Sequence, residues 1–235
     1  MSNENKLPAT SKTGDVDAFL RDLKRAPAVR PGGGRGRLIF ALDATASREP
    51  SWDRACRIQG EMFEATAALG GLDVRLVFYR GFDECKASRW MQNAADLHKA
   101  MRAVSCIGGE TQIERVLEHA IVESKKQRVH ALVFVGDAME ENADRLCKLA
   151  GELGLLGTPV FVFHEGSDAH AGAAFRQIAK LSRGAYLSFD VASAERLKEL
   201  LAAIAVYAAG GYWALADYSA KKGGDIKLLT AQLQG

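Results

Sequence analysis

Carboxylate and hydroxyl side chains come together directly after an apolar segment in the first quarter of the chain. The segment LIFAL, residues 38–42, runs into Asp43, and hydroxyl groups follow at Thr45 and Ser47. From a tight loop, side chains at these alternating positions can point into one pocket. Their oxygens are hard ligands, which suit Mg²⁺ or Mn²⁺ better than zinc or copper. The spacing therefore indicates a metal site built from oxygen ligands.

Two further polar positions follow the same logic. The segment ALVFV, residues 131–135, runs into Gly136 and Asp137, and Thr111 stands at the start of a strong helical pattern. In an open α/β sheet, ligands bind beyond the carboxyl ends of the strands, where the strand order reverses. We treat the two carboxylates as having no cationic neighbour in the sequence. The candidate metal ligands are Asp43, Thr45, Ser47, Thr111 and Asp137.

Short apolar runs alternate with longer amphipathic ones through the middle of the chain. This alternation predicts a doubly wound, mostly parallel, Rossmann-like α/β sheet of about six strands with helices on both faces. The expected strands are 38–42, 74–79, 131–135, 160–163 and 185–189, with 82–87 as a short edge strand paired with the strand before it. The expected helices are 52–69, 91–104, 111–126, 142–153, 169–182 and 193–209.

This arrangement resembles the von Willebrand factor A (VWA) domain with its metal-ion-dependent adhesion site (MIDAS). That family shows D-x-S-x-S after its first strand, a distant Thr, and a distant Asp after its fourth strand. Here Thr45 replaces the first Ser and keeps the hydroxyl. The resemblance implies a non-enzymatic, divalent-cation-dependent protein-binding module, in which an Asp or Glu of the partner completes the metal coordination. It also implies a bacterial, cytoplasmic protein that works with an AAA-type ATPase or a complex subunit.

Helix capping and a phosphatase site are the alternatives for the same residues. Thr111 could be the N-cap of the helix that follows it. A Mg²⁺-dependent haloacid-dehalogenase-like phosphatase would also place Asp43 after the first strand and an acidic loop at Asp137. However, Thr45 stands where that enzyme needs its acid, and the two lysines of the intervening helix, Lys125 and Lys126, lie at its far end.

Composition excludes several classes of function. The 31 basic and 29 acidic residues leave a net charge of +2, which favours neither a nucleic acid nor a membrane as partner. The uncharged stretch 200–216 is alanine-rich and broken by Gly210 and Gly211, so we expect a buried helix rather than a membrane span. Four cysteines without C-x-x-C spacing, behind a polar start without a secretion signal, favour the reducing cytoplasm.

Composition also divides the chain into three parts. Residues 1–36 are expected to form a flexible tail with a short amphipathic helix at 15–25 and an Arg/Gly-rich linker. Residues 37–210 are expected to form the VWA-like domain, and residues 211–235 a helical extension packed on it.

Overall fold

A computed structural model describes residues 35–49, 52, 55, 56, 60–66, 71–189 and 194–222. Within them, six strands form a single sheet in the order β3-β2-β1-β4-β5-β6. Every neighbouring pair is parallel except β2 with β3, which is antiparallel. This confirms the predicted α/β class. The strands are β1 (Gly36–Asp43), β2 (Leu72–Arg80), β3 (Glu84–Met91), β4 (Ala131–Gly136), β5 (Val160–Glu165) and β6 (Ala185–Phe189).

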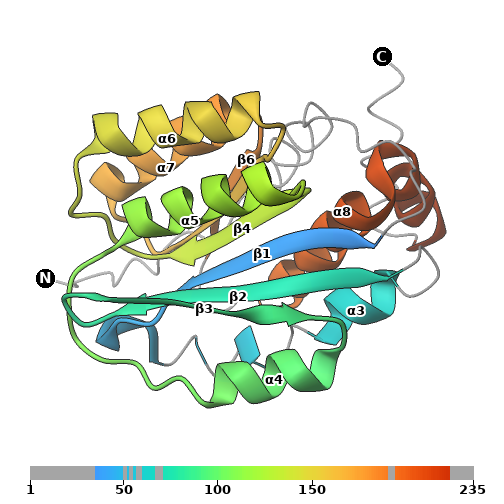
Figure 1. Cartoon of the computed structure of the whole chain (residues 1–235), viewed down its shortest axis with the longest axis horizontal. Helices are drawn as coiled ribbons and strands as arrows, with labels where there is room; N and C mark the ends of the chain where they lie inside the picture. Colours follow the sequence, from blue (N-terminus) through green and yellow to red (C-terminus); the bar gives the residue numbers. More distant parts are fainter. Residues whose placement is uncertain are drawn as a thin grey trace, which may run out of the picture.

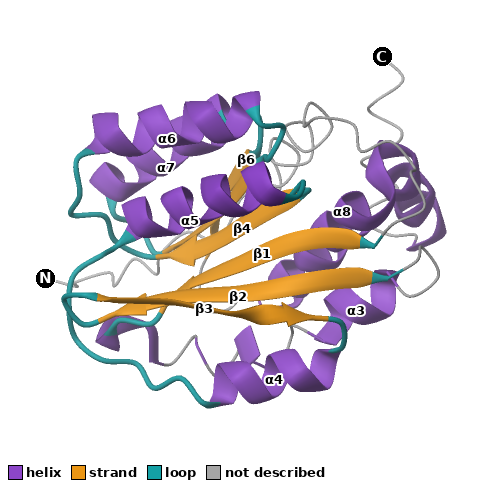
Figure 2. Ribbon diagram, viewed as in Figure 1, coloured by secondary structure: helices purple, strands orange, loops and turns teal. Residues whose placement is uncertain are grey.

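The central strands are continuously apolar because helices cover both faces of the sheet (Figure 1). Leu38, Phe40 and Leu42 of β1 point into one core, and Ile39 and Ala41 point into the other. The first core is closed by α3 (Gly60–Thr66), α4 (Ala94–Arg102) and α8 (Ala194–Lys222). The second is closed by α5 (Ile113–Lys126), α6 (Ala143–Leu155) and α7 (Ala169–Leu181), as Figure 2 shows. Both layers hold the strand ends in place.

The predicted helices are present with small shifts at their ends. α4, predicted over 91–104, begins only at Ala94, because β3 continues through Met91 and the side chain of Asn93 accepts a hydrogen bond from the backbone of Asp96 as the helix N-cap. The edge strand, predicted over 82–87, begins at Glu84 because Gly81, with a φ of 59°, opens a turn before it. Of the predicted helix 52–69, the structure describes Trp52, Ala55, Cys56 and α3.

The helix predicted over 193–209 and the start of the helical extension predicted after it form one kinked element. α8 continues to Lys222 across a kink at Gly211, whose φ is 75°. The uncharged stretch is largely buried against the sheet, with residues 200–208 of α8 at most 7% exposed.

Among the described helices, none is long and apolar enough to cross a membrane. The tail helix 15–25, the linker and the end of the chain lie outside the described residues, so the three-part division remains a prediction.

Candidate functional site

The candidate residues lie at the carboxyl edge of the sheet, where the strand order reverses. β1 pairs with β2 on one side and with β4 on the other. The connections that follow β1 and β4 therefore lead in opposite directions along the sheet. Asp43 is the last residue of β1, and Asp137 follows the last residue of β4. Thr111 lies in the loop that leads into α5. This edge is the expected ligand position for a doubly wound sheet.

Asp43 is fully buried and held by two donors. Its Oδ1 accepts a hydrogen bond of 2.7 Å from the backbone N–H of Thr45, and its Oδ2 accepts one of 3.0 Å from the hydroxyl of Tyr79. Burial raises the pKa of Asp43, and the negative charge of Asp137 raises it further, against the hydrogen bonds that lower it. The two carboxylates are therefore electrostatic neighbours, as their strands predict.

The two hydroxyl groups after β1 lie side by side. The Oγ1 of Thr45 and the Oγ of Ser47 are 3.2 Å apart, across the short 3-10 turn η1 (Ala46–Arg48). Thr45 stands at the N-cap position of that turn without a side-chain capping bond. The hydroxyl of Thr45 is thus not used to cap the turn, and both oxygens share the neighbourhood of Asp43.

Thr111 does not cap α5, so that alternative interpretation is wrong. Its Oγ1 accepts a hydrogen bond from the backbone N–H of Glu140, and its own N–H donates to Oε2 of Glu140. Gln112 occupies the N-cap position without a side-chain capping bond, and the carboxylate of Glu141 instead accepts hydrogen bonds from the N–H groups of Ile113 and Glu114. These contacts tie Thr111 to the loop that carries Asp137.

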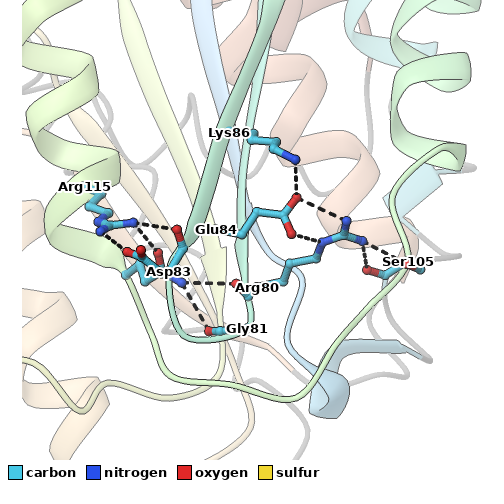
Figure 3. A network of polar contacts seen from close by, with 8 residues as sticks. Arg80, Gly81, Asp83, Glu84, Lys86, Ser105 and Arg115 are labelled. Atoms are coloured by element: carbon cyan, nitrogen blue, oxygen red, sulfur yellow. Dashed lines mark hydrogen bonds and ion pairs between the residues drawn. The ribbon is translucent and has the colours of Figure 1, made fainter.

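The loop before Thr111 is also fixed to the β2–β3 turn and to β1. The N–H of Ile107 donates to the carbonyl of Ala44 at 3.0 Å, and Gln112 donates to the carbonyls of Arg80 and Gly81. Figure 3 shows the surrounding ion pairs and hydrogen bonds, which are Arg80 with Glu84 and Ser105, Lys86 with Glu84, and Arg115 with Asp83. The position of Thr111 is therefore determined by tertiary contacts on three sides.

Asp137 carries the feature that best fits a site for a cation. Its Oδ1 is buried and accepts no hydrogen bond from the described part of the chain. A buried carboxylate oxygen without a partner costs about 1–3 kcal/mol or more, so such atoms in native proteins call for an explanation. A bound cation would remove this cost. Among the described residues, no three His, Cys, Asp or Glu side chains are placed to hold a metal ion together, so hydroxyl oxygens would have to complete a site here.

A buried arginine that the sequence did not single out lies near the two carboxylates. Arg48 is 3% exposed, and its guanidinium contacts Oε2 of Glu165 at the end of β5. Burial lowers the pKa of Arg48, whereas the charges of Asp137 and Asp43 raise it. Our assumption that the carboxylates have no cationic neighbour is therefore wrong. Arg48 directly follows Ser47, and Glu165 ends a strand, so position alone could have drawn attention to both.

Other residues near this edge have structural partners. His164 is buried, with Nδ1 2.9 Å from the hydroxyl of Tyr186 and Nε2 3.3 Å from the carbonyl of Asp137. Lys125 and Lys126, the lysines considered for a phosphatase, lie in the last turn of α5 and pair with Glu152 and Glu123. Because α5 is 14 residues long, its last turn is about 20 Å from its first, which leaves these lysines remote from Thr111.

No protein-family model and no curated protein matches the chain, but solved structures do. A von Willebrand factor type A protein from Catenulispora acidiphila aligns with a TM-score of 0.58 and 17% identity, over 72% of this chain and 42% of that one. The VWA domain of SpRpn10 aligns with a TM-score of 0.54 and 12% identity, over 67% and 88%. Proximal thread matrix protein 1 of the mussel byssus, with a zinc-occupied MIDAS motif, aligns with a TM-score of 0.56 and 16% identity, over 74% and 46%.

These similarities establish the fold. The chain has the VWA-like arrangement of a mostly parallel six-stranded sheet between two helical layers, as predicted. It spans less than half of the length of the Catenulispora and mussel proteins. At identities of 12–17%, the likeness does not extend to activity or ligand.

Proposed function

We propose that this protein is a divalent-cation-dependent protein-binding module. In this proposal, Mg²⁺ or Mn²⁺ binds at the carboxyl edge of the sheet, and an Asp or Glu of a partner protein binds to the cation. Five side chains would hold the ion: Asp43, Thr45, Ser47, Thr111 and Asp137. The cation would supply a positive charge with exchangeable coordination positions, which an incoming carboxylate can fill.

The unpartnered Oδ1 of Asp137, close to the buried carboxylate of Asp43, is the observation on which the proposal depends. A divalent cation would give this oxygen a partner and offset the repulsion between the two carboxylates. The paired hydroxyls of Thr45 and Ser47 add neutral oxygen donors, and so does Thr111. The mussel protein whose structure has zinc at its MIDAS supports a divalent ion in this kind of fold.

Two exposed apolar side chains near this edge would extend the contact with a partner. Phe82 is 76% exposed in the β2–β3 turn, and Ile107 is 46% exposed in the loop that hydrogen-bonds to that turn. Gly81 donates its N–H to the carbonyl of Ile107, so the two apolar residues belong to one connected surface. An exposed aromatic residue on a rigid turn is a good anchor for an interface.

Cation binding by the purified protein is the direct test. Titration calorimetry with Mn²⁺ and Mg²⁺ should detect one site, and millimolar cation should raise the melting temperature. Asp137→Asn should weaken binding at least tenfold, whereas Asp217→Asn, an exposed position on α8, should leave it unchanged. Thr111→Ser keeps the hydroxyl and should retain more affinity than Thr111→Ala. Equal heats for wild type and Asp137→Asn would place the ion elsewhere.

Carboxylate binding to the cation needs a separate test. Proton relaxation of water reports the exchangeable waters on protein-bound Mn²⁺. Acetate should reduce this relaxation by displacing water, and acetamide, its neutral isostere, should have little effect.

Partner binding should likewise require the cation, so a partner captured from lysate should elute with chelator and fail to bind Thr111→Ala. If a captured partner stays bound through chelation, recognition does not use the metal.

We place this module in the cytoplasm. In the described part of the chain, Cys56, Cys85, Cys106 and Cys147 form no disulfide, as a reducing compartment favours. An AAA-type ATPase or a complex subunit remains the predicted class of partner, and the capture experiment described above is the test for it.

A further inference from the structure

A buried ion pair joins two segments that follow different strands of the sheet. Arg48 lies in η1, directly after the candidate ligand Ser47, and its side chain is 3% exposed. Its partner Glu165 is the last residue of β5, and the side chain of Glu165 is 10% exposed. An arginine is permanently charged, so this pair places a fixed positive charge inside the domain.

The path of the Arg48 side chain brings this charge to the candidate cation site. β4 lies between β1 and β5, and neighbouring strands are about 4.8 Å apart, so a contact from the loop after β1 to the end of β5 must pass over the end of β4. Asp137 follows β4 at that point. The strand register shows that Asp137 and Glu165 lie at the same height along the sheet. Gly136, one residue before Asp137, pairs with His164, one residue before Glu165.

The positive charge of Arg48 offsets part of the negative charge at this edge. Asp43, Asp137 and Glu165 contribute three carboxylates, and Arg48 contributes one guanidinium, which leaves −2 if all are ionised. The pKa of Arg48 supports this proximity, since Asp137 and Asp43 are the two largest opposing charges against the effect of burial. A buried charge is stable only when it is paired, and here Arg48 contacts Glu165 and is attracted electrostatically by Asp137 and Asp43.

We propose that Arg48, anchored by Glu165, is a built-in counter-ion of the candidate cation centre and sets how tightly that centre holds a divalent cation. The inference rests on the proposed function. The guanidinium partly neutralises the carboxylates before a cation arrives and repels the cation that enters. The wild-type site is therefore a weak one, in which the ion is readily lost unless a partner carboxylate helps to hold it.

Substitution of Glu165 should change the cation affinity in the direction opposite to substitution of Arg48. As the anchor of Arg48, it draws part of the guanidinium charge away from Asp137. Removing the charge of Glu165 should let Arg48 pair more fully with Asp137 and exclude the cation more strongly. Removing Arg48 should have the reverse effect. A merely structural ion pair would make both substitutions act in the same direction, by loosening the edge of the sheet.

Mn²⁺ titration of four full-length proteins tests this difference in sign. Arg48→Met keeps an apolar chain of similar length, and it should bind Mn²⁺ at least tenfold more tightly than wild type. Arg48→Lys keeps the charge and should stay within threefold of wild type. Glu165→Gln should bind at least threefold more weakly. Binding by Arg48→Met that is equal to or weaker than wild type would overturn the inference. If circular dichroism shows that Arg48→Met does not fold, the direction of the Glu165→Gln change decides.

A double-mutant cycle in chelator tests the charge pairing without any cation. Asp137→Asn should lower the urea midpoint in the wild-type background, because it removes the attraction to Arg48. In the Arg48→Met background it should raise the midpoint, because it then relieves repulsion among carboxylates. Equal shifts in both backgrounds would reject the counter-ion role. Absence of Mn²⁺ binding in every variant would reject the proposed function itself, whereas binding that is insensitive to Arg48 would reject this inference alone.

Discussion

The hydroxyl of Tyr79 donates a 3.0 Å hydrogen bond to Oδ2 of Asp43, and both side chains are completely buried. The two residues are paired in register at the ends of β2 and β1, so their side chains leave the sheet on the same face. With the N–H of Thr45 on Oδ1, this bond holds the carboxylate in one orientation. Asp43 is thus positioned before any ligand binds, which lowers the cost of organising a site.

Tyr79→Phe should destabilise the domain by about 1.5–3 kcal/mol, since it removes a buried donor to a carboxylate. Urea unfolding measures this change. Tyr207 offers a matched control, because its buried hydroxyl has no hydrogen-bond partner among the described residues. Tyr207→Phe should therefore be neutral or stabilising. Similar losses for the two variants would contradict the hydrogen bond to Asp43.

Gly109→Ala should destabilise the protein and weaken cation binding. A Cβ on Gly109 would lie 2.0 Å from the carbonyl oxygen of Gly81, so the loop before Thr111 would have to move away from the β2–β3 turn. Overpacking of this kind costs about 1–3 kcal/mol. Thermal unfolding and Mn²⁺ titration should both respond.

Gly108→Ala is the control for that substitution, because a Cβ at Gly108 meets nothing within 4 Å. The added methyl group should leave stability and Mn²⁺ affinity unchanged, or raise stability slightly through the unfolded chain. If the two alanine variants behave alike, the close approach of loop and turn does not determine the position of Thr111.

Glu141→Ala should cost about 1–2 kcal/mol, because its carboxylate accepts hydrogen bonds from the N–H groups of Ile113 and Glu114 at the start of α5. Glu141→Gln keeps one acceptor oxygen and should lose less than half as much. Urea unfolding followed by far-ultraviolet circular dichroism gives both values. An equal loss for alanine and glutamine would show that charge alone, not hydrogen bonding, stabilises the helix start.

Stability should fall with acid between pH 6.5 and about 4 because of His130. Burial, with the nearby charges of Arg128 and Arg37, lowers its pKa from 6.5 to about 4. The folded protein binds this proton less readily than the unfolded chain, so the contribution is complete above pH 6.5 and is lost as the pH drops. After allowance for partial solvent exposure, the loss is about 2 kcal/mol.

His130→Asn isolates this contribution. Asn can replace the Nδ1 atom that accepts the backbone N–H of Arg37 at 3.0 Å, but it does not titrate. Urea midpoints from pH 7 to pH 4 should therefore decline less steeply for the variant than for wild type. Parallel profiles would mean that other groups cause the acid sensitivity.

The sequence by itself determined the fold class and the edge at which the candidate site lies. Strands such as 38–42 and 131–135 are recognisable because burial on both faces requires an unbroken apolar run, which is a local property. The helix kink was also visible locally, at Gly210 and Gly211, although α8 continues beyond it to Lys222. Asp43 and Asp137 could be assigned to one edge because parallel strands end on the same side of their sheet.

Only the tertiary structure decided how the side chains at that edge are paired. The contacts of Arg48 with Glu165 and of Thr111 with Glu140 join residues 117 and 29 positions apart, and nothing in the spacing of either pair indicates them. A periodic pattern reports which face of an element is buried, because burial repeats along the chain. Hydrogen bonds and ion pairs at a strand end depend on which loops the sheet order brings together. The local pattern therefore indicated the candidate oxygen ligands, and the fold alone revealed the arginine near them.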